Sequence, residues 1–224
     1  MEPVNVTRWI DARAVLVGAM LTCAVAVTAQ TPFQFPTANH ALYEPGGERQ
    51  FFAPTTPDKP WTSGSFGCVR DYSHRLHEGL DILHLHTDRR GEPTDPVMAT
   101  ADGTVVYINL RPSLSNYGNY VVIRHVIDGL EIYSLYAHLS AVRAGLKMGD
   151  PVKGGEVIAT MGRTSNAETI LKERAHVHFE LNLLINDNFP AWFRKASPGE
   201  RNDHGEWNGQ NLNGLDPSEI LIAE

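Results

Sequence analysis

Short runs of alternating and β-branched residues dominate the chain from residue 97 onward. Such runs, bounded by Gly, Pro, Asn and Asp, predict strands joined by tight turns. The dipeptides Asp102-Gly103 and Asp128-Gly129 are typical of hairpin turns. The expected strands are Val97–Asn109, Tyr120–Val126, Leu130–Ala137, Val157–Met161 and His176–Leu184.

Helical periodicity is scarce. Short helices are expected only around Ala167–Arg174 and Pro190–Lys195. The pattern therefore predicts a mainly β fold, an antiparallel β-sheet domain with few short helices.

The N-terminal segment has a different character. Arg8 and Arg13 precede an apolar run, and Val27-Thr28-Ala29 supplies the small residues of a signal-peptidase site. Residues 1–29 therefore predict a signal peptide and export to the periplasm or to the extracellular space and cell wall. Two alternatives are an uncleaved membrane anchor and a lipoprotein signal at Cys23, for which the preceding Thr22 is a poor match.

The remaining residues predict one domain with an extension. Residues 30–61, rich in Pro, Gly and Thr, are interpreted as an extended leader, and residues 62–224 as the domain. An insertion is expected at about 186–213, with Trp192, Phe193 and Trp207. These aromatic residues could hold glycan strands by stacking, but sealing the insertion onto the sheet is the favoured interpretation.

Charge and cysteine content argue against some classes of binding partner and against a disulfide. The net charge is −7, and removal of residues 1–29 leaves it unchanged. An acidic protein of this kind does not attract nucleic acid or an anionic membrane by charge alone. Beyond the signal, Cys68 is the only cysteine, so no intramolecular disulfide is expected. Its Gly-rich surroundings lack a helical signal, which favours a structural thiol over a nucleophile.

Two histidine-containing motifs suggest a metal site. His77 and Asp81 lie four residues apart, and His176 and His178 lie two apart in an expected strand. On a strand these two histidines and Glu180 share one face. Zinc accepts imidazole nitrogen and carboxylate oxygen, and a catalytic site uses three protein ligands. His77, Asp81 and one histidine of the pair can therefore form a metal triad.

Six blocks of sequence carry a family resemblance. They are Arg75–Ile82, Pro96–Val106, Tyr117–His125, Tyr136–Leu139, Gly149–Ala159 and Ala175–Glu180. In this order they resemble successive blocks of the lysostaphin/LytM-type zinc metallopeptidases. The resemblance runs from about Ser65 to Asn182, with a closing piece at Leu215–Pro217.

The resemblance implies a ligand set and a fold of that type with the metal in a groove. One Zn²⁺ ion would be bound by His77, Asp81 and His178, while His138 and His176 would assist catalysis. Either assisting histidine could take a proton from the attacking water, and the other could stabilise the developing oxyanion.

The implied function is a secreted zinc endopeptidase that hydrolyses peptide cross-links of bacterial peptidoglycan. Asn116, Tyr117 and Asn119 are expected to form a groove wall and to bind substrate. One alternative is a non-catalytic wall-binding activator of a separate amidase, because some relatives have lost ligands. Another is a zinc peptidase acting on Gly-rich proteins. His84 and His86, in a longer connection than the family pattern has, are interpreted as polar positions near the site.

Overall fold

The computed structural model describes residues 32–56, 58–70, 74–166 and 170–223 of the 224-residue chain. The expected signal peptide, residues 1–29, lies outside the described residues, as does the first part of the helix expected at Ala167–Arg174. The described end of that segment is a 3-10 turn, Lys172–Arg174.

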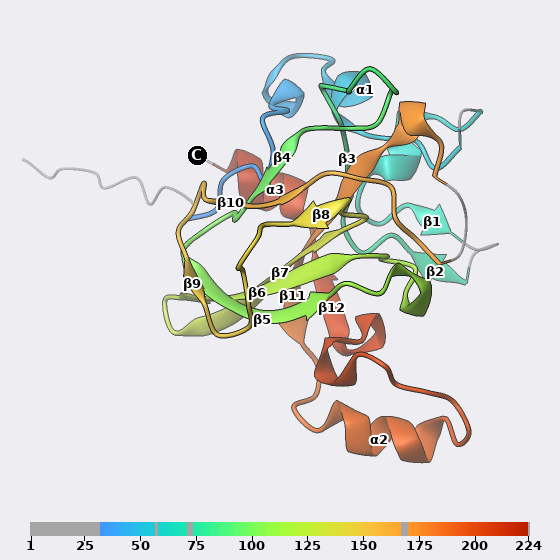
Figure 1. The fold of residues 1–224 in the computed structure, drawn as a ribbon, viewed down its shortest axis with the longest axis vertical. Coiled ribbons are helices and arrows are strands. Elements are labelled where there is room, and N and C mark those ends of the chain that lie inside the picture. Colours follow the sequence, from blue (N-terminus) through green and yellow to red (C-terminus); the bar gives the residue numbers. More distant parts are fainter. Residues whose placement is uncertain (1–31, 57, 71–73, 167–169, 224) are drawn as a thin grey trace, which may run out of the picture.

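A seven-stranded antiparallel sheet forms the centre of the molecule (Figure 1). Six of its strands follow one after another, and the seventh, β3 (Leu80–Leu83), pairs with β11, the second strand of that order. The order is β12 (Leu212–Leu215), β11 (His176–Leu184), β7 (Leu130–Ala137), β6 (Tyr120–Ile127), β5 (Gly103–Asn109) and β9 (Pro151–Val152).

Two smaller sheets accompany it. One has the order β4 (Pro96–Met98), β10 (Val157–Thr160) and β8 (Ala141–Val142), and the other pairs β1 (Val69–Arg70) with β2 (Arg75–Leu76). The larger of two apolar cores in the described part of the chain includes side chains from both larger sheets, among them Val97, Ile158, Val121 and Phe179. The mainly antiparallel β fold expected from the sequence is confirmed.

The expected strand Val97–Asn109 is wrong as a single element. It divides into β4 and β5, which belong to different sheets. Asp102-Gly103 is therefore not a hairpin turn between paired strands. A Cβ at Gly103 would lie 2.6 Å from the carbonyl oxygen of Arg124, so this glycine permits close approach of the backbones of β5 and β6. Asp128-Gly129, by contrast, forms the predicted turn between β6 and β7, with φ of 51° and 82°.

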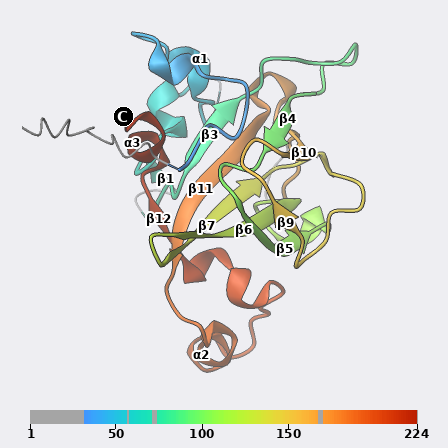
Figure 2. The same ribbon diagram turned by 90° about the vertical axis from the view of Figure 1, so that its left-hand side faces the viewer.

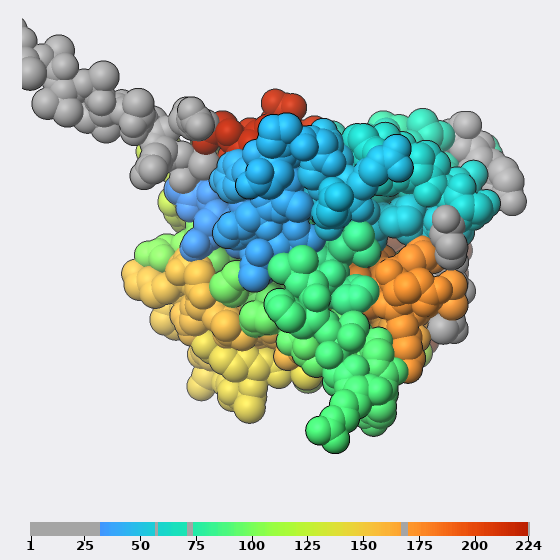
Figure 3. Space-filling model, turned by 90° about the horizontal axis from the view of Figure 1, so that it is seen from above, coloured from blue at the N-terminus to red at the C-terminus, as the bar shows by residue number. Residues whose placement is uncertain are grey.

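The segment from Phe33 to Phe52 packs against the domain. Its buried residues Phe33, Phe35, Phe51 and Phe52 belong to the main apolar core, and α1 (Glu48–Phe51) is its short helix. Phe52 forms an antiparallel bridge with Ile82 of β3. Figure 3 shows this blue-to-cyan segment spread over one end of the molecule.

The connection between β11 and β12 carries α2 (Phe189–Ala196), which stands away from the sheets (Figures 1 and 2). This helix confirms the one expected at Pro190–Lys195. Phe193 is buried, and Trp207 packs on Tyr133 with ring centroids 5.4 Å apart, whereas Trp192 is 50% exposed. Trp207 therefore packs the connection onto the sheet, whereas Phe193 is buried beside Phe189 of the same helix.

The chain described here ends in α3 (Pro217–Ile222), which Asp216 caps by accepting from the Ser218 N–H. Tyr43 in the N-terminal segment donates its hydroxyl to the carbonyl of Leu221 in this helix. Among the described residues, no helix has the length and apolar character needed to cross a membrane.

Candidate metal centre

Three side chains converge between β11 and the residues that lead into β3. His77 Nε2 lies 3.1 Å from Asp81 Oδ1 and 3.0 Å from His178 Nδ1, and His178 Nδ1 lies 2.9 Å from Asp81 Oδ1. Each residue is at most 5% exposed. The pairing of β3 with β11 places Asp81 directly opposite His178. The structure thus brings together the three residues expected to bind metal.

Outer partners fix which atom of each group faces inward. The carbonyl of Ser65 accepts from His77 Nδ1 at 2.8 Å, and Glu180 accepts from His178 Nε2 at 2.7 Å. Arg70 donates to the outer oxygen of Asp81 at 2.8 Å. These partners leave the lone pairs of Nε2 in His77 and Nδ1 in His178 directed at the shared centre.

The cluster attracts positive charge. Burial alone lowers the pKa of His178, but hydrogen bonds and charges from Asp81 and Glu180 outweigh it and raise that pKa to about 10. Burial raises the pKa of Asp81, but its interactions with His77, His176 and His178, which include hydrogen bonds from His178 and His77, outweigh burial and hold this pKa well below its usual value. Three electron-rich atoms at this spacing require a cation between them, either a proton or a metal ion.

The three atoms match a tetrahedral metal site. An ion with bonds of about 2.0–2.1 Å separates its ligand atoms by roughly 3.3–3.4 Å. The observed separations of 2.9–3.1 Å are close to that value. The donor set of two imidazoles and one carboxylate is one that zinc uses in catalytic sites. His77, Asp81 and His178 could therefore hold one divalent ion.

Two further histidines border the cluster. The rings of His138 and His176 lie 4.9 Å apart, and those of His138 and His178 lie 6.0 Å apart. Nδ1 of His176 donates to the carbonyl of Arg174, and Nδ1 of His138 donates to the carbonyl of Thr164. Both rings thus keep Nε2 as an acceptor.

Both of these rings are neutral at pH 7. Burial lowers the pKa of His138 to about 3, with the nearby His176 and His178 adding to the effect. Burial likewise lowers the pKa of His176. His138 is half-buried and His176 is 4% exposed, so His138 is the more accessible of the two.

His138 has an unusual backbone. It follows the last residue of β7 with φ of 59°, a left-handed conformation that costs a side-chain-bearing residue about 1 kcal/mol or more. Its N–H donates to the carbonyl of Tyr117 at 2.8 Å. The turn re-aims the chain so that the ring of His138 lies beside those of His176 and His178.

The expected groove-wall residues separate into different roles. Asn116 is exposed, and Asn119 donates from its side chain to the carbonyl of Leu139. Tyr117 does not point to solvent with its hydroxyl. It donates to Glu180 Oε1 at 2.7 Å, and its ring stacks on His178 at 5.5 Å between centroids. Tyr117 thus packs on the metal cluster itself.

Arg70 and Glu180 were not assigned a role from the sequence. The alternation in β11 placed Glu180 on the face of the two histidines, and this position was the only available signal. For Arg70 no local pattern links it to Asp81, eleven residues away. His84 donates Nδ1 to the carbonyl of Ala175, and His86 lies beside Asp95, so neither belongs to the cluster.

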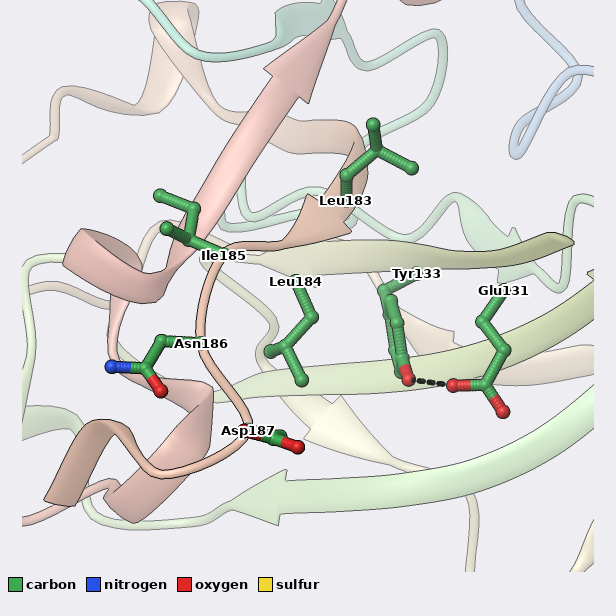
Figure 4. A pocket seen from close by; sticks show the side chains of 7 residues that line it. All are labelled: Glu131, Tyr133, Leu183, Leu184, Ile185, Asn186 and Asp187. Atoms are coloured by element: carbon green, nitrogen blue, oxygen red, sulfur yellow. Dashed lines mark hydrogen bonds between the residues drawn. The ribbon is translucent and has the colours of Figure 1, made fainter. Parts of the chain in front are cut away.

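Two open pockets in the described part of the chain lie outside the cluster. One, of about 520 Å³, is lined by β7 and by the end of β11 and the residues after it (Figure 4). Its residue Leu183 lies five positions beyond His178 on β11, which corresponds to roughly 16 Å along a strand. Another, of about 510 Å³, includes Ser140 and Thr164, so it adjoins the turn that holds His138.

Comparison with known families identifies the domain. The model of peptidase family M23 matches residues 75–188, half of the chain, from β2 through the residues that follow β11. The chain belongs to peptidase family M23. The matched range contains all three residues of the metal cluster as well as His138 and His176.

Individual M23 relatives match over this same part. The chain is 36% identical over 114 residues to the DD-carboxypeptidase/endopeptidase Mpg of Neisseria meningitidis serogroup B, covering 50% of this chain and 23% of that protein. It is 34% identical over 130 residues to the murein hydrolase activator NlpD of Escherichia coli, covering 57% of this chain and 29% of that protein. The chain thus spans about a quarter of the length of these relatives.

The chain is also similar to solved structures. A zinc-containing peptidase from Vibrio cholerae is 28% identical, with 60% of this chain and 37% of that chain covered and a TM-score of 0.39. The catalytic domain of lysostaphin from Staphylococcus simulans is 23% identical, with 52% and 75% covered and a TM-score of 0.38.

Proposed function

We propose that this M23 protein is an exported zinc-dependent endopeptidase that hydrolyses peptide cross-links of bacterial peptidoglycan. The observation that carries the proposal is the inward convergence of His77 Nε2, Asp81 Oδ1 and His178 Nδ1, each held from outside by its own partner. A protein that only binds cell wall has no need of three oriented ligands beside two neutral histidines. The activity named for the Mpg relative supports this substrate class.

One Zn²⁺ ion fits the cluster and would supply polarisation of the scissile carbonyl and acidification of the attacking water. Nε2 of His176 and Nε2 of His138 are lone-pair acceptors on neutral rings, so either can accept a proton from water. The carbonyls of Arg174 and Thr164 accept from Nδ1 of His176 and of His138. These hydrogen bonds keep the proton on Nδ1 and prevent the rings from flipping.

The two histidines divide the remaining work. Once one ring has accepted the proton, it can donate it to the departing amine of the cleaved peptide bond. The other can hydrogen bond to the oxygen on which negative charge develops. His138 is the more exposed ring and is the better placed to reach a bound peptide.

The test is mass analysis of fragments released from purified peptidoglycan by the protein, with and without a metal chelator. We expect release of uncross-linked peptides that stops on chelation and with His178→Ala. His86→Ala, which alters a 70% exposed side chain outside the cluster, is the matched control and should cleave like wild type. Cleavage by His178→Ala at the wild-type rate would contradict the ligand assignment.

A second function is favoured by one observation, the similarity to the murein hydrolase activator of E. coli. On that proposal the protein would stimulate a separate amidase and would itself release nothing. The same fragment analysis distinguishes the two, because an added amidase would then be required for any release, and His178→Ala would stimulate it as well as wild type does.

A further inference from the structure

We propose that the connection between β11 and β12, residues 185–211, orients the metal ligand His178 through Tyr117 and Glu180 and so helps to set the metal affinity of the site. This inference rests on the metal site of the proposed function. It assigns to the connection a positioning role that neither a substrate-binding surface nor a simple cover would have.

The first link is between Glu180 and His178. Glu180 is fully buried and accepts from His178 Nε2 at 2.7 Å. Its second oxygen accepts from the side-chain amide of Asn182 at 2.8 Å. A buried carboxylate with both oxygens bonded holds its position, because moving it would leave charge unpaired. Glu180 thereby keeps the N–H of His178 on the outer nitrogen and leaves Nδ1 free for the metal.

The second link is Tyr117, which lies in the loop between β5 and β6. Its hydroxyl donates to the same oxygen of Glu180 that accepts from His178, at 2.7 Å. Its ring stacks on the imidazole of His178 with an interplanar angle of 29°. Tyr117 thus fixes both Glu180 and the plane of the His178 ring, so a displaced Tyr117 would disturb the ligand in two ways.

The third link is a close approach of Gly209 to Tyr117. A Cβ at position 209 would lie 2.9 Å from the hydroxyl oxygen of Tyr117 and 3.2 Å from its Cε2. Gly209 does not have a left-handed backbone, so its conformation alone does not call for glycine. The backbone of the connection therefore forms a wall against which the end of the Tyr117 side chain rests.

The wall is itself fastened to the sheet. His204 is buried, donates to the carbonyl of Leu114 and accepts from the hydroxyl of Tyr107. The hydroxyl of Tyr120 donates to the carbonyl of Trp207 at 3.1 Å. These contacts hold residues 204–207 against β5, β6 and the loop that carries Tyr117, so the position of Gly209 is determined by the same loop that it supports.

The side chain of Asn211 joins the two ends of the connection by hydrogen bonds. Asn211 is 0% exposed and donates to the carbonyls of Asn186 and Glu206, while the N–H of Asn186 donates to its side-chain oxygen. These hydrogen bonds fix the conformation of the connection, so Gly209 can hold the side chain of Tyr117 in place relative to the sheet.

The test measures zinc affinity of the whole protein by competition with a coloured chelator. Tyr117→Phe removes the hydroxyl and should weaken zinc binding about tenfold, the lower range for loss of an outer partner. Gly209→Ala should weaken it about threefold or more because the new methyl group displaces Tyr117. Gln210→Ala changes an exposed side chain in the same turn and is the matched control, with unchanged affinity.

Two readouts exclude a merely structural effect. In the double variant, Gly209→Ala should add little to Tyr117→Phe, because the hydroxyl oxygen, the atom nearest to the new methyl group, is absent from phenylalanine. The ring ¹⁵N and ¹H signals of His178 Nε2 in the metal-free protein should move in both single variants and stay in Gln210→Ala. Full additivity, or wild-type affinity and unchanged signals in both single variants, would overturn the inference.

This outcome is separate from that of the proposed function. A wild-type protein that binds zinc, and whose affinity responds as described, supports the positioning role even when it releases nothing from peptidoglycan. A protein that cleaves peptidoglycan but whose zinc affinity ignores Tyr117 and Gly209 retains the proposed function and loses this inference.

Discussion

Nε2 of His77 and Nδ1 of His178 face each other at 3.0 Å, and each ring directs its other nitrogen to a partner outside the cluster. In this arrangement a cation must lie between the rings and Asp81. Without metal that cation is the proton on His178, whose pKa is raised to about 10. Proton and metal therefore compete for the same position.

The competition predicts that the stability of the protein depends more strongly on pH without metal than with it. Because the pKa of His178 in the folded, metal-free protein is raised above its value of about 6.5 in the unfolded chain, the proton stabilises the fold. This contribution is fully present below about pH 6.5 and is lost as the pH rises toward 10. With a chelator present, the urea concentration at the unfolding midpoint should fall as the pH rises through this window. For the zinc-loaded protein it should fall less.

The same measurement has an internal control. His178→Ala removes the titrating ring, so its metal-free urea midpoint should not show this fall. A wild-type midpoint that stays constant across the window, with chelator present, would show that the cluster does not hold a proton on His178.

Arg70 should control the metal cluster from outside. One of its terminal nitrogens donates both to the carbonyl of Ser63 and to the outer oxygen of Asp81. Arg70→Ala frees Asp81 to rotate and leaves its charge with one fewer donor, so we expect zinc affinity to fall about tenfold or more. Metal-free stability should fall by about 2 kcal/mol, as for other hydrogen bonds to charged groups.

Calorimetric zinc titration and urea denaturation check this prediction. Arg89→Ala, which removes an exposed arginine in the β3–β4 connection, should leave both quantities unchanged. Equal zinc affinities for Arg70→Ala and wild type would show that Asp81 needs no external positioning.

The N-terminal segment should be required for the fold. Phe52 is 3% exposed, bridges to Ile82, and is followed by Ala53, whose N–H donates to the carbonyl of Asp81 at 2.8 Å. Phe52→Ala leaves a cavity beside β3 and should lower the free energy of unfolding by about 3–5 kcal/mol. Urea denaturation measures this loss, and Val126→Ala, at a 61% exposed position, should stay within about 0.5 kcal/mol of wild type.

Deleting residues 1–53 gives a stronger form of the prediction. The product should lack a cooperative unfolding transition, because four buried phenylalanine side chains leave the core. A truncated protein that unfolds cooperatively and binds zinc like wild type would show that the segment is dispensable.

His138 should act on turnover and not on metal binding. Its ring borders the cluster without belonging to it, so His138→Asn should lower kcat on peptidoglycan by about 10²- to 10⁴-fold while zinc affinity stays near wild type. Asparagine tolerates the positive φ of this position, whereas His138→Ala should add a loss of stability.

Kinetics, zinc titration and thermal unfolding of the two variants separate these effects. A large loss of zinc affinity in His138→Asn would make this residue part of the metal site. A kcat close to that of wild type would remove it from the proposed mechanism.

Local patterns were sufficient for much of the fold. Strands β7 and β11 coincide with the expected ranges, because each is an uninterrupted run rich in β-forming residues. The run from Val97 to Asn109 failed because the chain leaves one sheet at Ala99 and enters another at Gly103, and no local pattern distinguishes a crossing from a continuous strand.

In the site, too, local sequence indicated some residues and not others. Spacing and residue type indicated His77, Asp81 and one histidine of the pair at 176 and 178, and the family resemblance added His138 and the choice of His178 as the ligand. The outer partners depend on contacts between distant segments, such as Tyr117 with Glu180, 63 positions apart. The contact of Tyr117 with Glu180 and with the ring of His178 had no signal in the sequence, because the direction of a loop is set by what packs behind it.

Three of the four clustered rings, those of His77, His138 and His176, are held by main-chain carbonyls, at Ser65, Thr164 and Arg174. A carbonyl is present whatever side chain the residue carries. The orientation of these rings therefore depends on the backbone path of three segments and not on the identity of the residues at the three positions. Alanine substitution at these positions would remove side-chain contacts of Thr164 and Arg174 but would leave the carbonyls that hold the rings in place. Anyone transplanting this centre into another scaffold would need to carry the loops across along with the histidines.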